Sequence, residues 1–386
     1  MRKFRLSPSL EVASQLRQWF GSVRVTYNWA LSCIKAKPKE FPVNKIWLRK
    51  RFVNSCNIPK QKGYLLQVPK HVRDGAIEDL VLAYTTNFAK RRNNPDHKFD
   101  IRYRSKKESQ SIVIPFDAIK SIDSDDGLKM YPTYLKNRIK FHTRQFRTLP
   151  CYDCRLVLDK LGRFTLHVPS VAACENQAGT LDAKTEWCSL DPGIRTMFTV
   201  YSPTPGIAYK LADRDISRIY RLCKHLDDLC SLATKRKRCN RSLIRQRERI
   251  RHLVDEVHWK IIHFLTTSFS NIILPSFEVS GMVNKCERVL TIKSVRQMLS
   301  WRFYEFKTRL IERCKRLPDV NVYIRGEEYT SKTCTNCQTI KEDLKGAKTY
   351  KCTHCGLVAD RDACGARNIF LKSAVCSADS IATLRP

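Results

Sequence analysis

Two cysteine pairs near the end of the chain have the spacing of a metal site. Cys334 and Cys337 form one Cys-x-x-Cys pair, and Cys352 and Cys355 form a second pair after fourteen intervening residues. Four thiolates on two such turns can close a tetrahedron around Zn²⁺. The other common use of Cys-x-x-Cys is a redox pair, but two matched pairs without a thioredoxin-like context favour zinc. A closed four-cysteine site is structural, so we predict a zinc ribbon that performs no chemistry itself.

Three acidic residues could do that chemistry. Asp191 ends a predicted strand, Glu278 follows another, and Asp362 begins the helix after the ribbon. Each alone has an ordinary interpretation as a turn residue, a surface acid or a helix N-cap, and the last applies equally to Asp360. If the three converge, they can all ionise only where cations neutralise them, and Mg²⁺ prefers such oxygen ligands. Two Mg²⁺ ions would support in-line hydrolysis of a phosphodiester.

The charge of the chain indicates a polyanionic partner. Lys and Arg number 71 against 37 Asp and Glu, which leaves a formal net charge of +34. Such a surface attracts nucleic acid in a salt-dependent way, and the main alternative is an anionic membrane surface. Because the chain has no run of about 18 apolar residues, we expect no membrane-spanning segment. The length of 386 residues suggests two or three domains.

The remaining cysteines do not suggest a disulfide framework. Seventeen is an odd number, and most of those outside the ribbon stand singly in apolar stretches. This pattern favours a reducing, intracellular compartment. Cys151 and Cys154 form a third Cys-x-x-Cys, but no fourth pair lies near it in the sequence, so we do not expect a second zinc there.

The first quarter of the chain is predicted to be helical after a short strand. Residues 3–6 resemble a strand, and apolar residues then recur at steps of three and four from Leu10 to Ile34. Further helices are expected at about 44–56 and 70–92. Basic residues alternate there with Trp and Tyr, which suits either a nucleic-acid surface or a scaffold whose aromatics fill the core. The candidate contacts in this block are Arg49, Lys50 and Arg51.

Short strands dominate the next part of the chain and suggest a small barrel. They are expected at 99–103, 109–116, 138–142, 152–158 and 163–169. The opening strand at 3–6 can complete the barrel, with the helical block inserted after it. A polar stretch at 174–185 is predicted to be a linker.

The second half of the chain has the pattern of a layered α/β domain. The predicted order is three strands, two long helices, a strand, a helix, a strand, the ribbon and a final helix, which indicates a mixed sheet. We place the single helix before the last strand at 291–316. The basic run 235–238 resembles a nuclear-localisation signal, although a nucleic-acid-facing helix end is favoured. The candidate contacts in this region are Lys237, Arg238, Arg241 and Arg245.

Four motifs resemble those of the transposon-encoded TnpB nucleases, and especially their eukaryotic and viral relatives, the Fanzor proteins. The motifs are LDPGIRT, ILPSFEVSGM, YTSKTCTNC with CTHCG, and DRDACGARNI. The resemblance implies an α/β RNase H-like (RuvC) nuclease domain with an inserted four-cysteine zinc ribbon. It also implies a preceding small β-barrel of the wedge type that carries an inserted helical recognition domain. The implied activity is RNA-guided DNA cleavage, in which a guide RNA pairs with the target and the protein reads a short adjacent motif.

Carried onto this chain, the resemblance makes Asp191, Glu278 and Asp362 the catalytic, magnesium-binding acids. Asp362 is preferred to Asp360 because two residues separate the family's acid from a small pair, here 365–366. Two positions depart from the family pattern. Cys364 stands where Asn is usual, and Gln338 stands where Gly is usual.

The resemblance also implies domain boundaries and partners. The expected division is a first wedge strand at 1–8, a helical recognition domain at 9–97, the rest of the barrel at 98–175, a nuclease core at 176–328, a ribbon at 329–359, a final nuclease helix at 360–373 and a tail at 374–386. The expected partners are a guide non-coding RNA and double-stranded target DNA, bound by a monomer that is nuclear in a eukaryotic host.

Two other functions are considered. The first is guided DNA binding without cleavage, which the presence of all three acids disfavours. The second is a cut-and-paste transposase on the same fold. Such enzymes usually order their acids Asp, Asp, Glu, whereas the order here is Asp191, Glu278, Asp362.

Overall fold

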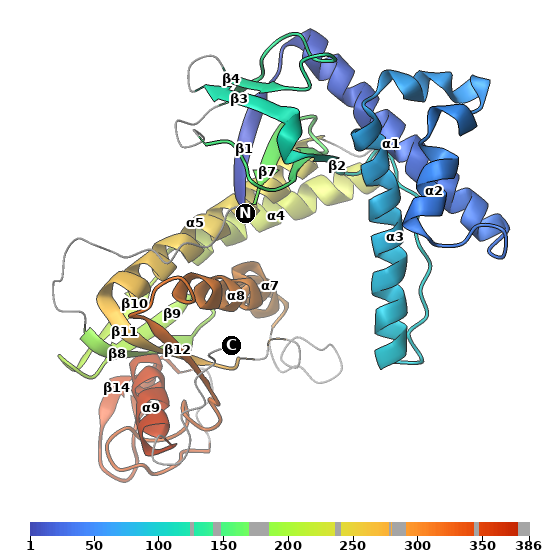
Figure 1. Ribbon diagram of the computed structural model, residues 1–386. Helices are drawn as coiled ribbons and strands as arrows, with labels where there is room; N and C mark the ends of the chain where they lie inside the picture. The colour runs from blue at the N-terminus through green and yellow to red at the C-terminus, as the bar shows by residue number, and fades with distance from the viewer. Residues whose placement is uncertain are drawn as a thin grey trace. The chain divides into compact units, whose positions relative to one another are not determined.

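The chain folds into two compact units, Met1–Val171 and Ala172–Pro386. The computed structural model describes residues 1–123, 127–141, 148–169, 185–235, 241–277, 279, 291–342 and 347–376 (Figure 1). The division between the units lies beside the polar stretch predicted to be a linker. Within these described residues no helix combines the length and apolar character needed to cross a membrane.

Three helices lie between the first strand of the first unit and its remaining strands. They are α1 (Leu10–Ala36), α2 (Lys45–Phe52) and α3 (Lys70–Asn93), with short 3₁₀ turns at Ser55–Asn57 and Lys60–Gln67 between the last two. Helix α2 is shorter than the predicted helix at 44–56. The reason is a contact from α3. The Arg73 guanidinium donates to the Val53 carbonyl at 2.7 Å, and a longer α2 would use this carbonyl as an acceptor within the helix.

The sheet of the first unit has five strands in the order β2-β6-β7-β1-β5. Strand β1 (Arg2–Ser7) pairs antiparallel with β7 (Phe164–Val168) and with β5 (Lys140–Phe141). Strand β6 (Cys154–Leu158) joins β7 to β2 (Gln110–Ile114). The first strand therefore joins the later ones across the inserted helices, as predicted. A separate hairpin, β3 (Ile119–Asp123) with β4 (Gly127–Met130), is missing from the predicted strands.

The predicted strand at 99–103 is wrong. This segment is in no strand, although Ile101 is buried in the core of the unit. The Asn28 side chain in α1 pairs with the backbone of Arg104, the residue that follows this segment. Its amide oxygen accepts from the Arg104 N–H at 2.8 Å, and its amide nitrogen donates to the Arg104 carbonyl at 3.0 Å. A helix side chain thus takes the place of a neighbouring strand.

The second unit contains the predicted mixed sheet, in the order β10-β9-β8-β11-β12. Strands β8 (Thr185–Pro192), β9 (Phe198–Ser202) and β10 (Ile207–Leu211) pair antiparallel with one another in that order. Strand β11 (Phe269–Pro275) runs parallel to β8 and to β12 (Asn321–Arg325). The carboxyl ends of β8, β11 and β12 therefore meet at one edge of the sheet.

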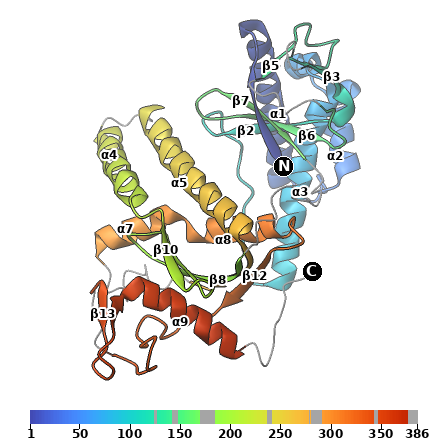
Figure 2. The same cartoon turned by 90° about the vertical axis from the view of Figure 1, so that its left-hand side faces the viewer.

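Helices cover the two faces of this sheet unequally (Figure 2). One face packs against α5 (Arg241–Ser268), α7 (Ile292–Trp301), α8 (Phe303–Cys314) and the start of α4 (Asp215–Lys235), and the other carries α9 (Arg361–Cys376). Alternate strand residues point to each side. Those in the apolar core with α5 and α8 include Cys188, Leu190, Phe198, Val200, Ile272 and Leu274.

The single helix predicted at 291–316 is two helices, because Arg302 interrupts it. Arg302 adopts a left-handed backbone conformation with φ +55° and forms the C-cap of α7 and the N-cap of α8. Its guanidinium contacts Asp255 of α5 at 2.9 Å and also pairs with Glu305. These ion pairs offset the cost of left-handed backbone at a residue with a Cβ.

Candidate active site and metal centre

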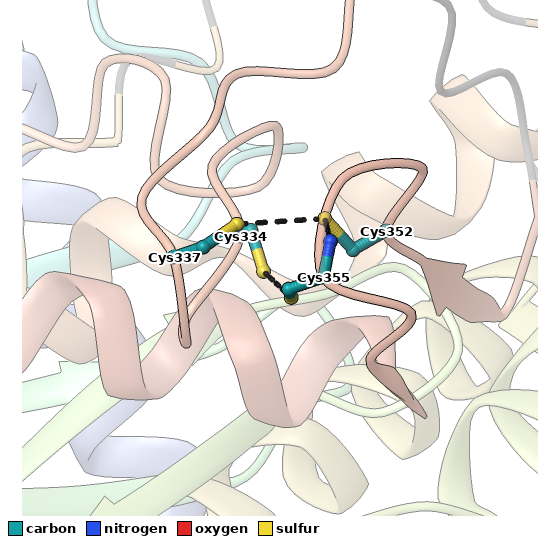
Figure 3. A group of neighbouring side chains, drawn as sticks. All are labelled: Cys334, Cys337, Cys352 and Cys355. Atoms are coloured by element: carbon teal, nitrogen blue, oxygen red, sulfur yellow. Dashed lines mark hydrogen bonds between the residues drawn. The ribbon is translucent and has the colours of Figure 1, made fainter.

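The four ribbon cysteines converge on one point (Figure 3). Their sulfur atoms all lie within 4.8 Å of one another, and the pairs Cys334–Cys355 and Cys337–Cys352 are each 3.6 Å apart. A tetrahedral Zn²⁺ with Zn–S bonds of about 2.3 Å requires sulfur atoms about 3.8 Å apart. The arrangement therefore fits zinc and supports the predicted ligand set.

The backbone of the ribbon prepares these thiols to lose protons. The N–H groups of His354 and Cys355 both point to the Cys352 sulfur at 3.4 Å. The Thr339 hydroxyl and N–H lower the pKa of Cys337 to about 5. Burial, in contrast, raises the pKa of Cys334 to about 11. A cation at the centre would stabilise all four thiolates.

The two cysteine turns share a left-handed residue after their second cysteine. Gln338 follows Cys337 with φ +61°, and Gly356 follows Cys355 with φ +72°. Glycine adopts this conformation without the steric cost that a Cβ brings. The family's usual glycine at position 338 is therefore explained by the backbone, and Gln338 is strained.

Replacing Gln338 by glycine should stabilise the zinc-loaded ribbon by about 1 kcal/mol, because it removes that strain. Competition with a zinc chelator measures the effect. The reverse change, Gly356→Gln, is the matched control and should weaken zinc retention, since a Cβ at Gly356 meets no atom within 4 Å and only the backbone is altered. Equal zinc retention in all three proteins would contradict this explanation.

Asp191 ends β8 on the face of the sheet that carries α9. The Ser189 hydroxyl, two residues earlier on the same face, donates to the Ala366 carbonyl of α9 at 2.7 Å. Helix α9 approaches so closely that a Cβ on Gly365 would lie 2.9 Å from the Asp191 Oδ2. Only glycine at position 365 leaves room for the Asp191 carboxylate in this place.

Asp360 and Asp362 have different surroundings at the start of α9. The Asp360 carboxylate accepts from the backbone N–H groups of Asp362 and Ala363, at 3.0 and 3.2 Å, and so caps the helix. Its other oxygen lies 2.7 Å from the Lys210 ammonium. The Asp362 carboxylate is 3.6 Å from the Arg361 guanidinium and acts on Asp191 electrostatically. This difference supports the choice of Asp362 over Asp360.

A further carboxylate belongs to this group and was missed from the sequence. Glu327 follows β12 by two residues, and it is among the charges that raise the pKa of Asp191. Burial raises the pKa of Glu327 itself, and the neighbouring Glu328 adds to that shift. No short motif marks Glu327 in the sequence, and it joins this group because β12 ends at the same sheet edge as β8.

Glu278, the third acid of the resemblance, lies outside the described residues. Among the residues that the structure describes, the ribbon cysteines are the one group of three or more His, Cys, Asp or Glu ligand atoms within 4.8 Å of one another. The carboxylate oxygens of Asp191, Asp362 and Glu327 therefore do not all lie within 4.8 Å of one another.

The electrostatics of Asp191 nonetheless fit a cation. Burial raises the pKa of its carboxyl well above the usual range, and the charges of Asp362 and Glu327 raise it further. Among the described residues, no hydrogen bond or ion pair satisfies this half-buried carboxylate. A divalent metal bound by oxygen ligands would offset both the burial of the Asp191 charge and its repulsion by the neighbouring carboxylates.

Asn368 connects α9 to the segment that precedes the ribbon. Its buried amide donates to the carbonyls of Thr330 and Thr333, both at 2.8 Å. The Thr330 hydroxyl in turn donates to the Glu327 carbonyl at 2.8 Å. The helix that carries Asp362 is thereby tied to the loop that carries Glu327.

The other cysteines singled out from the sequence are structural in this fold. Cys364 is buried beside Tyr350 and the zinc ligands, on the ribbon side of α9. Burial raises the pKa of its thiol. Cys154 is buried and donates to the Tyr152 carbonyl, whereas Cys151 is exposed. No metal-ligating group includes the latter pair among the described residues.

The candidate nucleic-acid contacts are mostly exposed. Arg49 is engaged with Asp74 through two contacts of 2.9 and 3.0 Å, while Lys50 and Arg51 of α2 face solvent. Arg241 and Arg245 lie exposed on the first turns of α5, and Lys237 and Arg238 lie outside the described residues. The aromatics of the helical block divide between the two interpretations. Trp19 and Tyr27 are buried in the core, and Trp47 is partly exposed.

Two family models match parts of the chain. The model described as "Cas12f1-like, TNB domain" matches residues 303–369, which contain α8, β12, the ribbon and the start of α9. The model described as "Helix-turn-helix domain" matches residues 1–40, which form β1 and the single helix α1 here.

Similar proteins cover nearly the whole chain. A protein of Paramecium bursaria Chlorella virus 1 that carries a transposase name is 29% identical over 96% of this chain and 86% of its own. A TnpB-like protein of Acanthamoeba polyphaga mimivirus is 25% identical over 95% of this chain and 72% of its own. A protein of Streptomyces pristinaespiralis named as an RNA-guided DNA endonuclease is 23% identical over 97% of this chain and 90% of its own.

A solved structure shares the fold. The Cas12f1 chain in a complex with single guide RNA and target DNA superposes with a TM-score of 0.52 at 14% identity, over 94% of this chain and 83% of that one. The matched TNB domain, the TnpB-like relatives and this shared fold lead to one conclusion: the chain is similar to proteins of the TnpB family.

Proposed function

We propose that this protein is a Mg²⁺-dependent, RNA-guided DNA endonuclease whose active site lies in the RNase H-like second unit. One observation carries the proposal: the Asp191 carboxylate is unsatisfied and half-buried at the carboxyl edge of the sheet, and the charges of Asp362 and Glu327 both act on it. Such a site repels itself without a cation. The relative named as an RNA-guided DNA endonuclease and the guided Cas12f1 complex support the same activity.

Asp191 and Asp362 would hold the metal, with Glu278 or Glu327 completing the ligand set. Bound magnesium would supply an activated water and neutralise charge on the phosphate that is cut. The chain's own residues position these ligands. Ser189 and Asn368 fix α9 on the sheet and against the preceding loop, and Asp360 caps the helix whose first turn carries Asp362.

The proposed nucleic-acid partners account for the charge of the chain. A bound guide RNA and its heteroduplex with the target strand are polyanions, and a net charge of +34 suits a channel that holds both. In this proposal the guide supplies sequence specificity, and the protein reads a short motif beside the target.

Guided cleavage can be tested with the complete ribonucleoprotein. The protein is purified from cells that also transcribe the DNA flanking its gene, and the RNA bound to the protein is sequenced. Plasmids that match the guide segment of this RNA are then incubated with the complex in Mg²⁺. We expect a cut beside the matched site, no cut with a mismatched guide, and a cut that moves when the guide is changed. Cleavage that ignores the guide, or that survives removal of the RNA, would disprove guiding.

A transposase is the second candidate, because the Chlorella virus relative carries a transposase name. The two functions differ in their products. A transposase joins transposon ends to a new DNA, whereas a nuclease only hydrolyses its target. Incubation of the complex with labelled transposon ends and a recipient plasmid should give no joined product if the nuclease proposal is right.

A further inference from the structure

Lys210 lies in the same row of the sheet as Asp191. In the antiparallel pairing, Lys210 of β10 is opposite Thr199 of β9, and Thr199 is opposite Asp191 of β8. Residues directly opposite each other in antiparallel strands point to the same face. Two strand spacings separate Lys210 from Asp191, which is about 10 Å. A flexible lysine side chain can cover much of that distance.

Asp360, the ion-pair partner of Lys210, does not need the lysine to cap α9. The Lys210 ammonium lies 2.7 Å from one oxygen of Asp360, and the other Asp360 oxygen already accepts two backbone N–H groups at the start of α9. The helix cap is therefore complete without the lysine. Both side chains are also well exposed, at 46% for Lys210 and 41% for Asp360. Exposed pairs of this kind contribute little to stability.

The charge around this position explains what the lysine can do. The groups facing it are acidic: Asp360, Asp362 and Asp213 all act on Lys210. Two of the nearby acids also act on Asp191 in the same row: Asp362 and Glu327. A DNA phosphate entering this cluster meets strong repulsion, which a mobile cation on the same face would reduce.

We propose that Lys210 leaves Asp360 and binds a backbone phosphate of the DNA strand being cut, so that it positions the substrate beside Asp191. The inference rests on the proposed nuclease function. It makes Lys210 a substrate-binding residue of the second unit, and it gives Asp360 the role of holding the ammonium at the site before DNA arrives.

Single-turnover cleavage by the guided complex tests this role. K210Q should cut about 10- to 100-fold more slowly, as expected for the loss of a charged phosphate contact, and K210R should stay within about threefold of the wild type. The matched control is K315Q. Lys315 has a similar exposed ion pair, with Glu312 at 3.2 Å, but it precedes β12 at the opposite edge of the sheet.

A second measurement does not require cleavage. With Ca²⁺ in place of Mg²⁺, affinity of the guided complex for its matched duplex is measured against salt concentration. Loss of one phosphate contact should reduce the slope of log affinity against log salt by about 0.7 to 0.9 in K210Q, but not in K315Q or K210R. The proposal is overturned if K210Q leaves this slope unchanged and slows cleavage no more than K315Q does.

The two proposals can fail separately. A wild-type complex that binds its target in Ca²⁺ but never cuts in Mg²⁺ would end the nuclease proposal, and the salt slope would still decide whether Lys210 contacts DNA. A wild type that cuts, together with a K210Q variant indistinguishable from it in rate and slope, would end only the Lys210 inference.

Discussion

Replacing Asp191 by asparagine is expected to slow guided DNA cleavage by at least about 1,000-fold, because an amide cannot supply the charge that holds a catalytic cation. Replacing Asp362 by asparagine should have a similar effect. Binding of the guide and the target should stay intact, since neither carboxylate is needed for the fold. Single-turnover cleavage with saturating complex measures the rate, and the exposed Asp228 of α4 provides the matched control variant D228N.

Asp191 also allows a test that excludes misfolding. Its folded-state pKa is raised, so ionisation of this carboxyl destabilises the metal-free fold at neutral pH. The D191N variant should therefore melt at a higher temperature than the metal-free wild type. That advantage should shrink as the pH falls through the folded pKa, and it should vanish below the unfolded value of about 3.9. A D191N protein that melts at a lower temperature than the metal-free wild type and still cuts DNA would contradict both the predicted stabilisation and the predicted loss of cleavage.

The same cleavage assay decides which glutamate completes the site. If Glu327 is a metal ligand, E327Q should lose activity as D362N does, and E278Q should be milder. The opposite ranking would assign the role to Glu278 and leave Glu327 as a buried neighbour. Either result is interpretable only beside the D191N rate, because Asp362 and Glu327 both act on the ionisation of Asp191.

Removing the zinc ligands should produce the second large effect. A protein in which Cys334 and Cys352 are both serine is expected to contain no zinc, whereas the wild type should contain about one ion per chain. Zinc supplies about 10–16 kcal/mol to a site of this type, which a short segment cannot replace by packing. The variant should also lose cleavage, because the ribbon contacts α9 through Cys364 and through the Arg361 N–H, which donates to the Lys348 carbonyl at 2.9 Å.

Elemental analysis and single-turnover cleavage measure these two losses on the same preparations. The control is Cys151→Ser, which alters an exposed Cys-x-x-Cys cysteine outside any described metal group and should retain both zinc and activity. Zinc-free protein that cuts at the wild-type rate would show that the ribbon does not position α9. Wild-type protein without zinc would refute the metal site itself.

The convergence of the four ribbon cysteines was predictable from sequence because its geometry is local. Each Cys-x-x-Cys fixes two ligands within one turn, so spacing alone defines the site. Asp191 was predictable for a related reason, since a residue that ends a buried strand must lie at a sheet edge. Glu327 was missed because its role depends on β12 lying two strands from β8, which no short motif encodes.

The errors in secondary structure have specific physical causes. The segment at 99–103 alternates like a strand, yet the Asn28 side chain pairs with the backbone of the next residue, Arg104, from a distant helix. Arg302 separates α7 from α8, and no glycine or proline marks this break in the sequence. Its ion pairs with Asp255 and Glu305 stabilise the left-handed backbone at this position. In both cases a tertiary contact overrides the local pattern.

The Asn368 hydrogen bonds also have an evolutionary consequence. They anchor the chain before the ribbon, at Thr330 and Thr333, to the helix that follows the ribbon. The ribbon is therefore an interchangeable module held at both of its ends. The free energy of closing a loop changes only slowly with its length, so insertions or deletions within the ribbon arms can accumulate in a lineage without moving Asp362. The sequence of the ribbon arms can then diverge while the position of α9 on the sheet stays constant.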